Sequence, residues 1–124
     1  MNEEVPVTKI LIGMFMDLKT KDDYEIMMRS IATEDLYLPM NGNDVVFMTD
    51  SENHQYIPLF TSTSEENELK HTSYDVVKVE KIIREIYDLG KFDSIVINPF
   101  TDDVIIGEKS VELLKRLIAK NKQN

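Results

Sequence analysis

The sequence contains no cysteine and no tryptophan among its 124 residues. Without cysteine the chain cannot form a disulfide, supply a thiol nucleophile or build a thiolate zinc site. The absence agrees with a reducing compartment, and we expect a cytoplasmic protein.

Long hydrophobic runs are also missing. The longest apolar stretch, residues 10–16, is interrupted by Gly13 and lies between Lys9 and Asp17. A membrane span requires about 20 apolar residues, and a signal peptide requires a basic flank and a cleavage site. We therefore expect neither a membrane span nor a secretory leader.

Lysine and arginine are absent from residues 30–69, although the whole chain contains 14 of them. The same segment carries eight carboxylates: Glu34, Asp35, Asp44, Asp50, Glu52, Glu65, Glu66 and Glu68. The net charge of -9 argues against a nucleic-acid partner, because phosphate binding requires basic residues. Two interpretations of the segment stay open, a solvated face that maintains solubility and a negative surface that attracts a basic protein.

Helical spacing of apolar residues predicts helical structure over residues 10–18 and 24–31, either as two short helices or as one bent helix. Thr20 and Asp23 have the spacing of a capping pair for the second helix. Met14, Met27 and Met28 share this spacing and are predicted to lie in the core.

Two more helices are predicted nearer the C-terminus. One covers residues 79–89 and ends at Gly90, and its buried apolar stripe is predicted to consist of Val79, Ile82, Ile83, Ile86 and Leu89. The other covers residues 108–120.

Strand-like alternation replaces helical spacing between residues 35 and 61. It predicts an antiparallel meander of three strands, residues 36–40, 45–49 and 55–60, with polar turns between them. Pro39 and Pro58 cannot donate to a ladder, so each must lie at an edge, at a bulge or where its amide would point outward.

Further strands are predicted over residues 74–77, 94–98 and 104–106, the last two joined by a turn at residues 101–103. The fold expected from these elements is a single α+β domain over residues 1–124. It contains a mostly antiparallel sheet of about five strands, with the helices mainly on one face.

Four short motifs lie between residues 27 and 117. They are Tyr37-Leu38-Pro39, Tyr56-Ile57-Pro58-Leu59-Phe60-Thr61-Ser62, Thr63-Ser64-Glu65-Glu66 and Ile95-Val96-Ile97-Asn98-Pro99. Together they resemble the N-terminal domain of the SseB family. The resemblance implies a fold and no reaction, because the family supplies no catalytic residue to carry over. It also implies a second domain in the fuller members, and we expect a single domain here.

Candidate catalytic and metal-binding residues are few. His54 and His71 have neither metal-ligand spacing nor an evident orienting partner. Thr63 and Glu66 have the form of a capping box, which starts a short helix ending near His71. The pair Asp102-Asp103 is typical of a turn, since calcium needs six or more oxygen ligands. We predict no catalytic residue, no cofactor and no metal.

The predicted function is a non-catalytic, cytosolic protein-binding or adaptor module, for which the charge favours a basic partner. The candidate partner-binding residues are Asp44, Glu52, Tyr56, Phe60, Thr61, Ser62, Glu65 and Asn98. Two alternatives stay open. One is a small-ligand pocket near the helix start at residues 61–64 and the strand end at Asn98-Pro99, and the other is a stoichiometric inhibitor or immunity protein that masks a basic effector.

Overall fold

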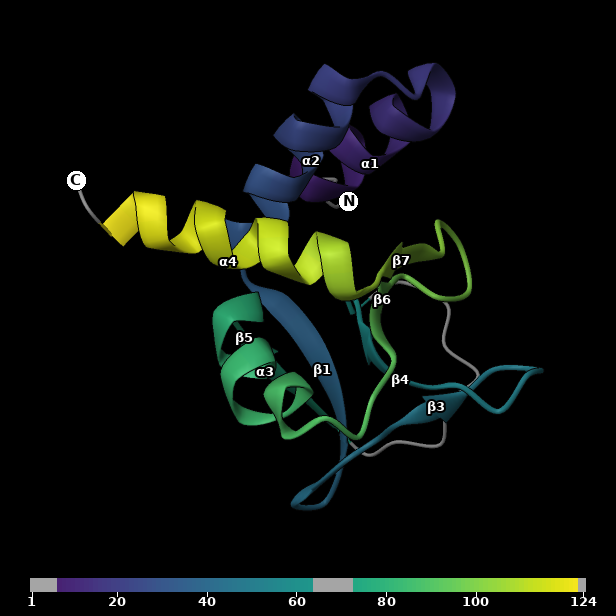
Figure 1. The fold of residues 1–124 in the computed structure, drawn as a ribbon. Helices are drawn as coiled ribbons and strands as arrows, with labels where there is room; N and C mark the ends of the chain where they lie inside the picture. Colours follow the sequence, from purple (N-terminus) through teal and green to yellow (C-terminus); the bar gives the residue numbers. More distant parts are fainter. Residues whose placement is uncertain (1–6, 64–72, 123–124) are drawn as a thin grey trace, which may run out of the picture.

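The computed structural model describes residues 7–63 and 73–122 (Figure 1). The described chain begins with a helical hairpin, α1 (Val7–Leu18) and α2 (Lys21–Thr33). Thr20 caps α2, because its side-chain oxygen accepts a 3.0 Å hydrogen bond from the Asp23 amide. The predicted helical structure and its cap are confirmed, and of the two open alternatives the structure has two helices rather than one bent helix.

The helix predicted over residues 79–89 is interrupted. It consists of α3 (Val79–Glu85) and a short 3-10 helix, η1 (Tyr87–Leu89). The break falls at Ile86, whose φ of -124° and ψ of -58° lie outside the helical region. Gly90 closes η1 with a φ of 79°, a conformation that glycine adopts without strain. Leu89 is 64% exposed, so its predicted place in the buried stripe is wrong.

The strands form two sheets, where the sequence predicted one. The first sheet has the order β2-β1-β5 and the second has the order β3-β4-β6-β7. The strands are β1 (Leu36–Asn41), β2 (Asp44–Val45), β3 (Met48–Thr49), β4 (Gln55–Leu59), β5 (Ser73–Val77), β6 (Ser94–Ile97) and β7 (Val104–Ile106). The strand predicted over residues 45–49 is divided between the sheets as β2 and β3. The predicted meander is wrong because β2 and β3 belong to different sheets, and the predicted single sheet of about five strands is wrong for the same reason. In the described chain the β4–β6 pair is parallel and the other named strand pairs are antiparallel, and the α+β class is confirmed.

Two prolines account for the split between the sheets. Tyr37 of β1 and Phe60, after β4, exchange backbone hydrogen bonds of 2.8 and 2.9 Å in one antiparallel bridge. The next hydrogen-bonded pair of such a ladder would be Pro39 and Pro58. Neither has an N–H to donate, so the ladder stops after one bridge. The Pro39 carbonyl instead accepts a 3.0 Å hydrogen bond from the Val46 amide.

One hydrophobic core joins the helices to both sheets. Its buried residues include Ile12 of α1, Met27 and Met28 of α2, and Leu114 of α4 (Glu108–Lys122). Figure 1 shows α4 running between the helical hairpin and the sheets. Met14 is 44% exposed, so its predicted burial is wrong.

Inward and outward residues alternate along the second sheet. Ile57, Leu59, Ile95 and Ile97 belong to the core cluster, and the residues between them face the opposite side. None of the helices in the described part of the chain has the length and hydrophobicity needed to span a bilayer.

Candidate functional site

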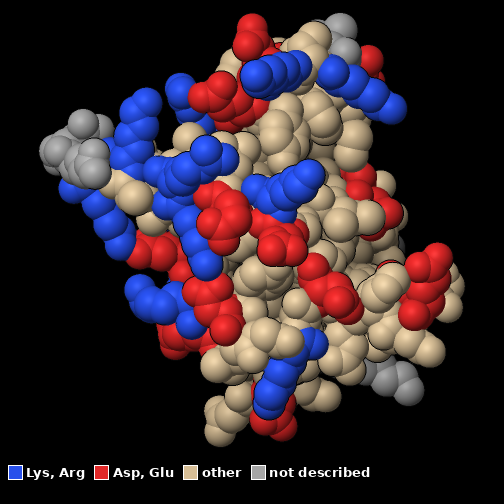
Figure 2. All heavy atoms as spheres, in the orientation of Figure 1, with Lys and Arg blue, Asp and Glu red and all other residues tan. Residues whose placement is uncertain are grey.

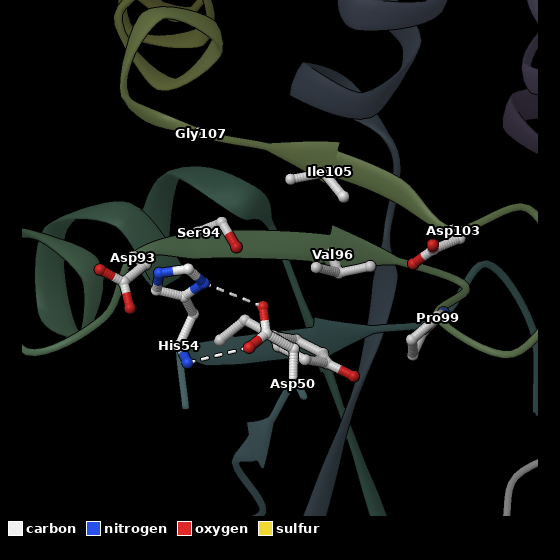
Figure 3. Close-up of a pocket in the computed structure, with 10 residues that line it drawn as sticks. Asp50, His54, Asp93, Ser94, Val96, Pro99, Asp103, Ile105 and Gly107 are labelled. Atoms are coloured by element: carbon white, nitrogen blue, oxygen red, sulfur yellow. Dashed lines mark hydrogen bonds and ion pairs between the residues drawn. The ribbon is translucent and has the colours of Figure 1, made fainter. Parts of the chain in front are cut away.

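A hollow of about 570 Å³ lies on the face of the second sheet that is turned away from the core (Figure 3). Outward-facing residues of β4, β6 and β7 form its floor, among them Tyr56, Val96 and Ile105. Val96 and Ile105 are direct partners in the antiparallel β6–β7 ladder. Val96 is only 3% exposed and Ile105 is 64% exposed, so Ile105 supplies most of the accessible apolar surface that these two residues give the floor.

Three carboxylates surround this floor: Asp50 in the β3–β4 turn, Asp93 before β6 and Asp103 before β7. None of the ten lining residues is lysine or arginine. The Asp93 carboxylate accepts a 3.1 Å hydrogen bond from the Gln55 amide. Asp103 has a left-handed backbone (φ 52°), and its amide donates a 2.8 Å hydrogen bond to the Asn98 carbonyl. We call this concave surface the acidic hollow.

His54 also lines the acidic hollow and is oriented by Asp50. Its Nδ1 lies 3.1 Å from Asp50 Oδ2, while Asp50 Oδ1 accepts hydrogen bonds from the amides of Glu52 (2.8 Å) and His54 (2.9 Å). The sequence prediction that His54 has no orienting partner is wrong. The missed signal was an aspartate four residues before a histidine, in a turn where aspartate side chains commonly bind nearby amides.

This pair shifts the pKa of both groups. The hydrogen bond to Asp50, followed by its charge, raises the pKa of His54 above 6.5. The hydrogen bond from the His54 amide lowers the pKa of Asp50 below 3.8. The His54 contribution to stability is therefore fully present below about pH 6.5 and disappears as the pH rises through the folded-state pKa. The Asp50 contribution is present above about pH 3.9 and is lost as the pH falls through its lowered pKa.

We predict that an NMR titration of the His54 ring will give a pKa above 6.5. In Asp50→Asn the pKa should move back toward 6.5, because the negative partner has gone. Glu52→Gln should change the pKa less, since Glu52 lies farther away, at 3.7 Å, and contributes only charge. An identical His54 pKa in the native protein and in Asp50→Asn would contradict this assignment.

A buried amide ties together the ends of β4 and β6 beside the acidic hollow. Asn98 Oδ1 accepts a 3.0 Å hydrogen bond from the Thr61 amide, and Asn98 Nδ2 donates to Thr61 Oγ1 (3.0 Å) and Asp102 Oδ2 (2.9 Å). Lys9 of α1 donates to the same Asp102 oxygen at 2.6 Å. These contacts fix the loop at residues 98–103, which also supplies Pro99 and Asp103 to the acidic hollow.

Of the predicted partner-binding residues that the structure describes, only Tyr56 lines the acidic hollow. Burial, then the Asp103 and Asp50 charges, raise the pKa of Tyr56. Phe60 and Asn98 are 0% exposed and Thr61 is 4% exposed, which leaves them no surface for direct contact. We correct their predicted role to one of support, holding together the strand ends that carry the hollow.

The other predicted residues are dispersed. Asp44 and Glu52 are exposed, but Asp44 begins β2 and Glu52 belongs to the β3–β4 turn. The β1–β2 and β3–β4 turns extend in different directions (Figure 1). Ser62 is half-buried, next to Thr61. Glu65, with the predicted capping box and the short helix after it, lies outside the described residues.

The predicted negative surface is not continuous on the face shown in Figure 2. Acidic side chains there are separated by basic and uncharged ones, and basic side chains gather over α4. Asp35, from the segment without basic residues, is paired with Lys78 at 3.0 Å. The predicted broad negative surface is therefore broken up on this face, whereas three carboxylates lie together around the acidic hollow.

The described lining of the acidic hollow contains three carboxylates and one histidine. Within residues 7–63 and 73–122, no hydroxyl is hydrogen-bonded to His54, so no nucleophile is positioned for it. The same residues contain no group of three or more His, Asp or Glu side chains that could hold a metal ion.

No protein-family model, curated protein or solved structure matches the chain. The resemblance to the SseB family stays a prediction.

Proposed function

We propose that this protein is a non-catalytic binding module that recognises a basic segment of a protein partner through the acidic hollow. One observation carries the proposal. A single concave surface combines an apolar floor, with Val96 and Ile105, and three carboxylates, Asp50, Asp93 and Asp103. We place the module in the cytosol, in line with the absence of cysteine.

Lysine and arginine side chains suit this surface because they are amphipathic. Their apolar stems pack along hydrophobic surface while the charged head groups bind carboxylates, and arginine does so with two parallel hydrogen bonds. The floor of the acidic hollow offers the first kind of contact and its rim offers the second. The same negative charge repels phosphate groups, so the surface does not suit nucleic acid.

The three carboxylates contribute in different ways. Within the described chain, the Asp103 side chain has no hydrogen-bond or ion-pair partner, and Asp93 Oδ2 accepts one amide hydrogen bond. Asp103 and Asp93 therefore keep acceptor capacity for a cation. Asp50 is already bound to His54 and to two amides, so it acts chiefly through its charge.

A small cationic ligand is the second candidate. The volume of the hollow, about 570 Å³, lies within the range of about 300–1,000 Å³ that is common for small-molecule sites. A stoichiometric inhibitor that covers a basic effector would be one form of the first function. A competition experiment separates the two candidates. A free polyamine should displace a basic peptide effectively from a small-ligand site, and poorly from a site that recognises a protein segment.

We predict that the double variant Asp93→Asn, Asp103→Asn binds arginine-containing peptides about tenfold or more weakly, which corresponds to about 1.4 kcal/mol. The native interaction should also weaken steeply as salt increases from about 0.1 M to about 1 M, which shortens the Debye length from about 10 Å to about 3 Å. Isothermal titration calorimetry measures both effects.

The matched control is Asp44→Asn, which removes an exposed carboxylate of β2 outside the hollow. It should bind like the native protein. Both proteins should keep the native melting temperature within a few degrees, since exposed charges contribute little to stability. If Asp44→Asn lost half or more of the binding free energy that the double variant loses, the loss per removed charge would be no greater in the hollow than outside it, and the proposed site would be overturned.

A further inference from the structure

The acidic hollow is elongated along β6 and has a carboxylate at each end (Figure 3). Asp93 immediately precedes β6. Asp103 lies opposite Asn98, which immediately follows β6, because the Asp103 amide donates to the Asn98 carbonyl. Val96 and Ile105 face each other between these ends. The order along the hollow is therefore carboxylate, apolar floor, carboxylate.

The spacing of the two ends follows from strand geometry. A strand rises about 3.3 Å per residue, so the backbone positions of Asp93 and Asn98 are about 16 Å apart. In an extended peptide, side chains i, i+2 and i+4 point to one side and span about 13 Å. The long stems of lysine and arginine can make up the remaining distance.

We infer that the acidic hollow binds an extended peptide segment in which alternate residues are basic, apolar and basic. This inference rests on the proposed function and adds the pattern of the partner. The first basic side chain pairs with Asp93, the apolar side chain packs on Ile105, which is 64% exposed, and the second basic side chain pairs with Asp103.

A helical segment with basic residues at i and i+4 does not reach both Asp93 and Asp103. A helix rises about 1.5 Å per residue, so residues i and i+4 lie only about 6 Å apart along its axis. Two basic residues separated in this way would reach Asp93 or Asp103, but not both. With the i, i+4 spacing of basic residues inferred above, the partner segment is therefore extended, since a helix would need basic residues about 11 positions apart to span the same distance of about 16 Å.

The Asp103 end of the acidic hollow is held in place by contacts within the chain. Asp103 belongs to the loop that Asn98 and Asp102 anchor, and Lys9 ties this loop to α1. A site fixed in advance loses less conformational entropy on binding. The anchored loop thus favours a partner with a fixed spacing between its two charges.

The test uses short fluorescent peptides with the full chain, measured by fluorescence anisotropy. The first peptide has two arginines at positions i and i+4 and leucine at i+2, separated by serine and glycine. The second has the same composition with the arginines adjacent. The third replaces the leucine with serine. We expect the first peptide to bind about tenfold more tightly than either of the others.

Variants of the chain locate the two ends. Asp93→Asn and Asp103→Asn should each weaken the first peptide severalfold, and each should reduce its advantage over the peptide with adjacent arginines. Asp44→Asn should do neither, because Asp44 lies outside the hollow. Spermidine at the concentration of the peptide should displace it poorly, because it offers charge without the leucine contact.

Equal affinity of all three peptides, with losses in both aspartate variants, would overturn the inferred pattern and leave the proposed function standing. Displacement by spermidine as effective as by the peptide itself would also overturn the pattern. The absence of binding by every peptide at about 1 mM, a free energy weaker than about 4 kcal/mol, would overturn the proposed function itself.

Discussion

Replacing Ile97 with alanine should lower the free energy of unfolding by about 2–5 kcal/mol. Ile97 is 0% exposed and lies in the middle of the second sheet, opposite Leu59 of β4 and Val104 of β7. Close-packed neighbours on both strands cannot fill the space that the lost methyl and methylene groups leave. Urea denaturation, followed by circular dichroism, measures the change.

Ile105→Ala is the matched control, because it makes the same truncation on the adjacent strand. The Ile105 side chain faces solvent and the residue is 64% exposed. Its replacement should change the free energy of unfolding by no more than about 0.5 kcal/mol. Similar losses in the two variants would mean that the two faces of the sheet are assigned incorrectly.

The second large effect is expected for Asn98→Ala, at about 2–4 kcal/mol. Alanine removes the acceptor for the buried Thr61 amide and the donor to Thr61 Oγ1 and Asp102. An unsatisfied buried group costs about 1–3 kcal/mol. Asn98 also has a left-handed backbone (φ 52°), which alanine adopts at an additional cost of about 1 kcal/mol.

Two variants separate these causes. Asn98→Gly removes the hydrogen bonds but adopts a positive φ easily, so it should cost about 1 kcal/mol less than Asn98→Ala. Asn53→Ala introduces alanine at a φ of 66° in an exposed turn, and should show the backbone cost alone. A loss as small in Asn98→Ala as in Asn53→Ala would refute the structural role of the buried amide.

Local structure was well predicted from the sequence, because it depends on neighbouring residues. The spacing of apolar residues correctly placed α1, α2 and α4, and Thr20 marked the start of α2. The same reasoning predicted that Met14 and Leu89 would be buried, but both side chains are exposed. Helical spacing identifies a face, but only the packing of the other elements decides how far that face is covered.

Strand pairing was predicted less well, because it depends on residues distant in sequence. The parallel β4–β6 pair joins Tyr56 to Ser94, and nothing local to either strand indicates it. A signal for the split was present in Pro39 and Pro58. It could be used only once the Tyr37–Phe60 bridge had fixed the register.

The acidic hollow was missed for the same reason. Its carboxylates come from the β3–β4 turn, the start of β6 and the loop before β7, and the sheet brings these segments together. The sequence indicated that the binding surface would be negative, and it indicated Tyr56 as a candidate binding residue. It did not indicate that Asp93 and Asp103, outside the segment without basic residues, would define the two ends.

The central claim is that the acidic hollow receives the basic segment, and NMR mapping on the ¹⁵N-labelled chain tests it most directly. On titration with the alternating basic, apolar, basic peptide, the largest amide shifts should come from Tyr56, Val96, Asp103 and Ile105. The double variant Asp93→Asn, Asp103→Asn should lose these shifts while keeping a native spectrum elsewhere. Shifts that cluster on another surface, or that persist unchanged in the double variant, would contradict the account.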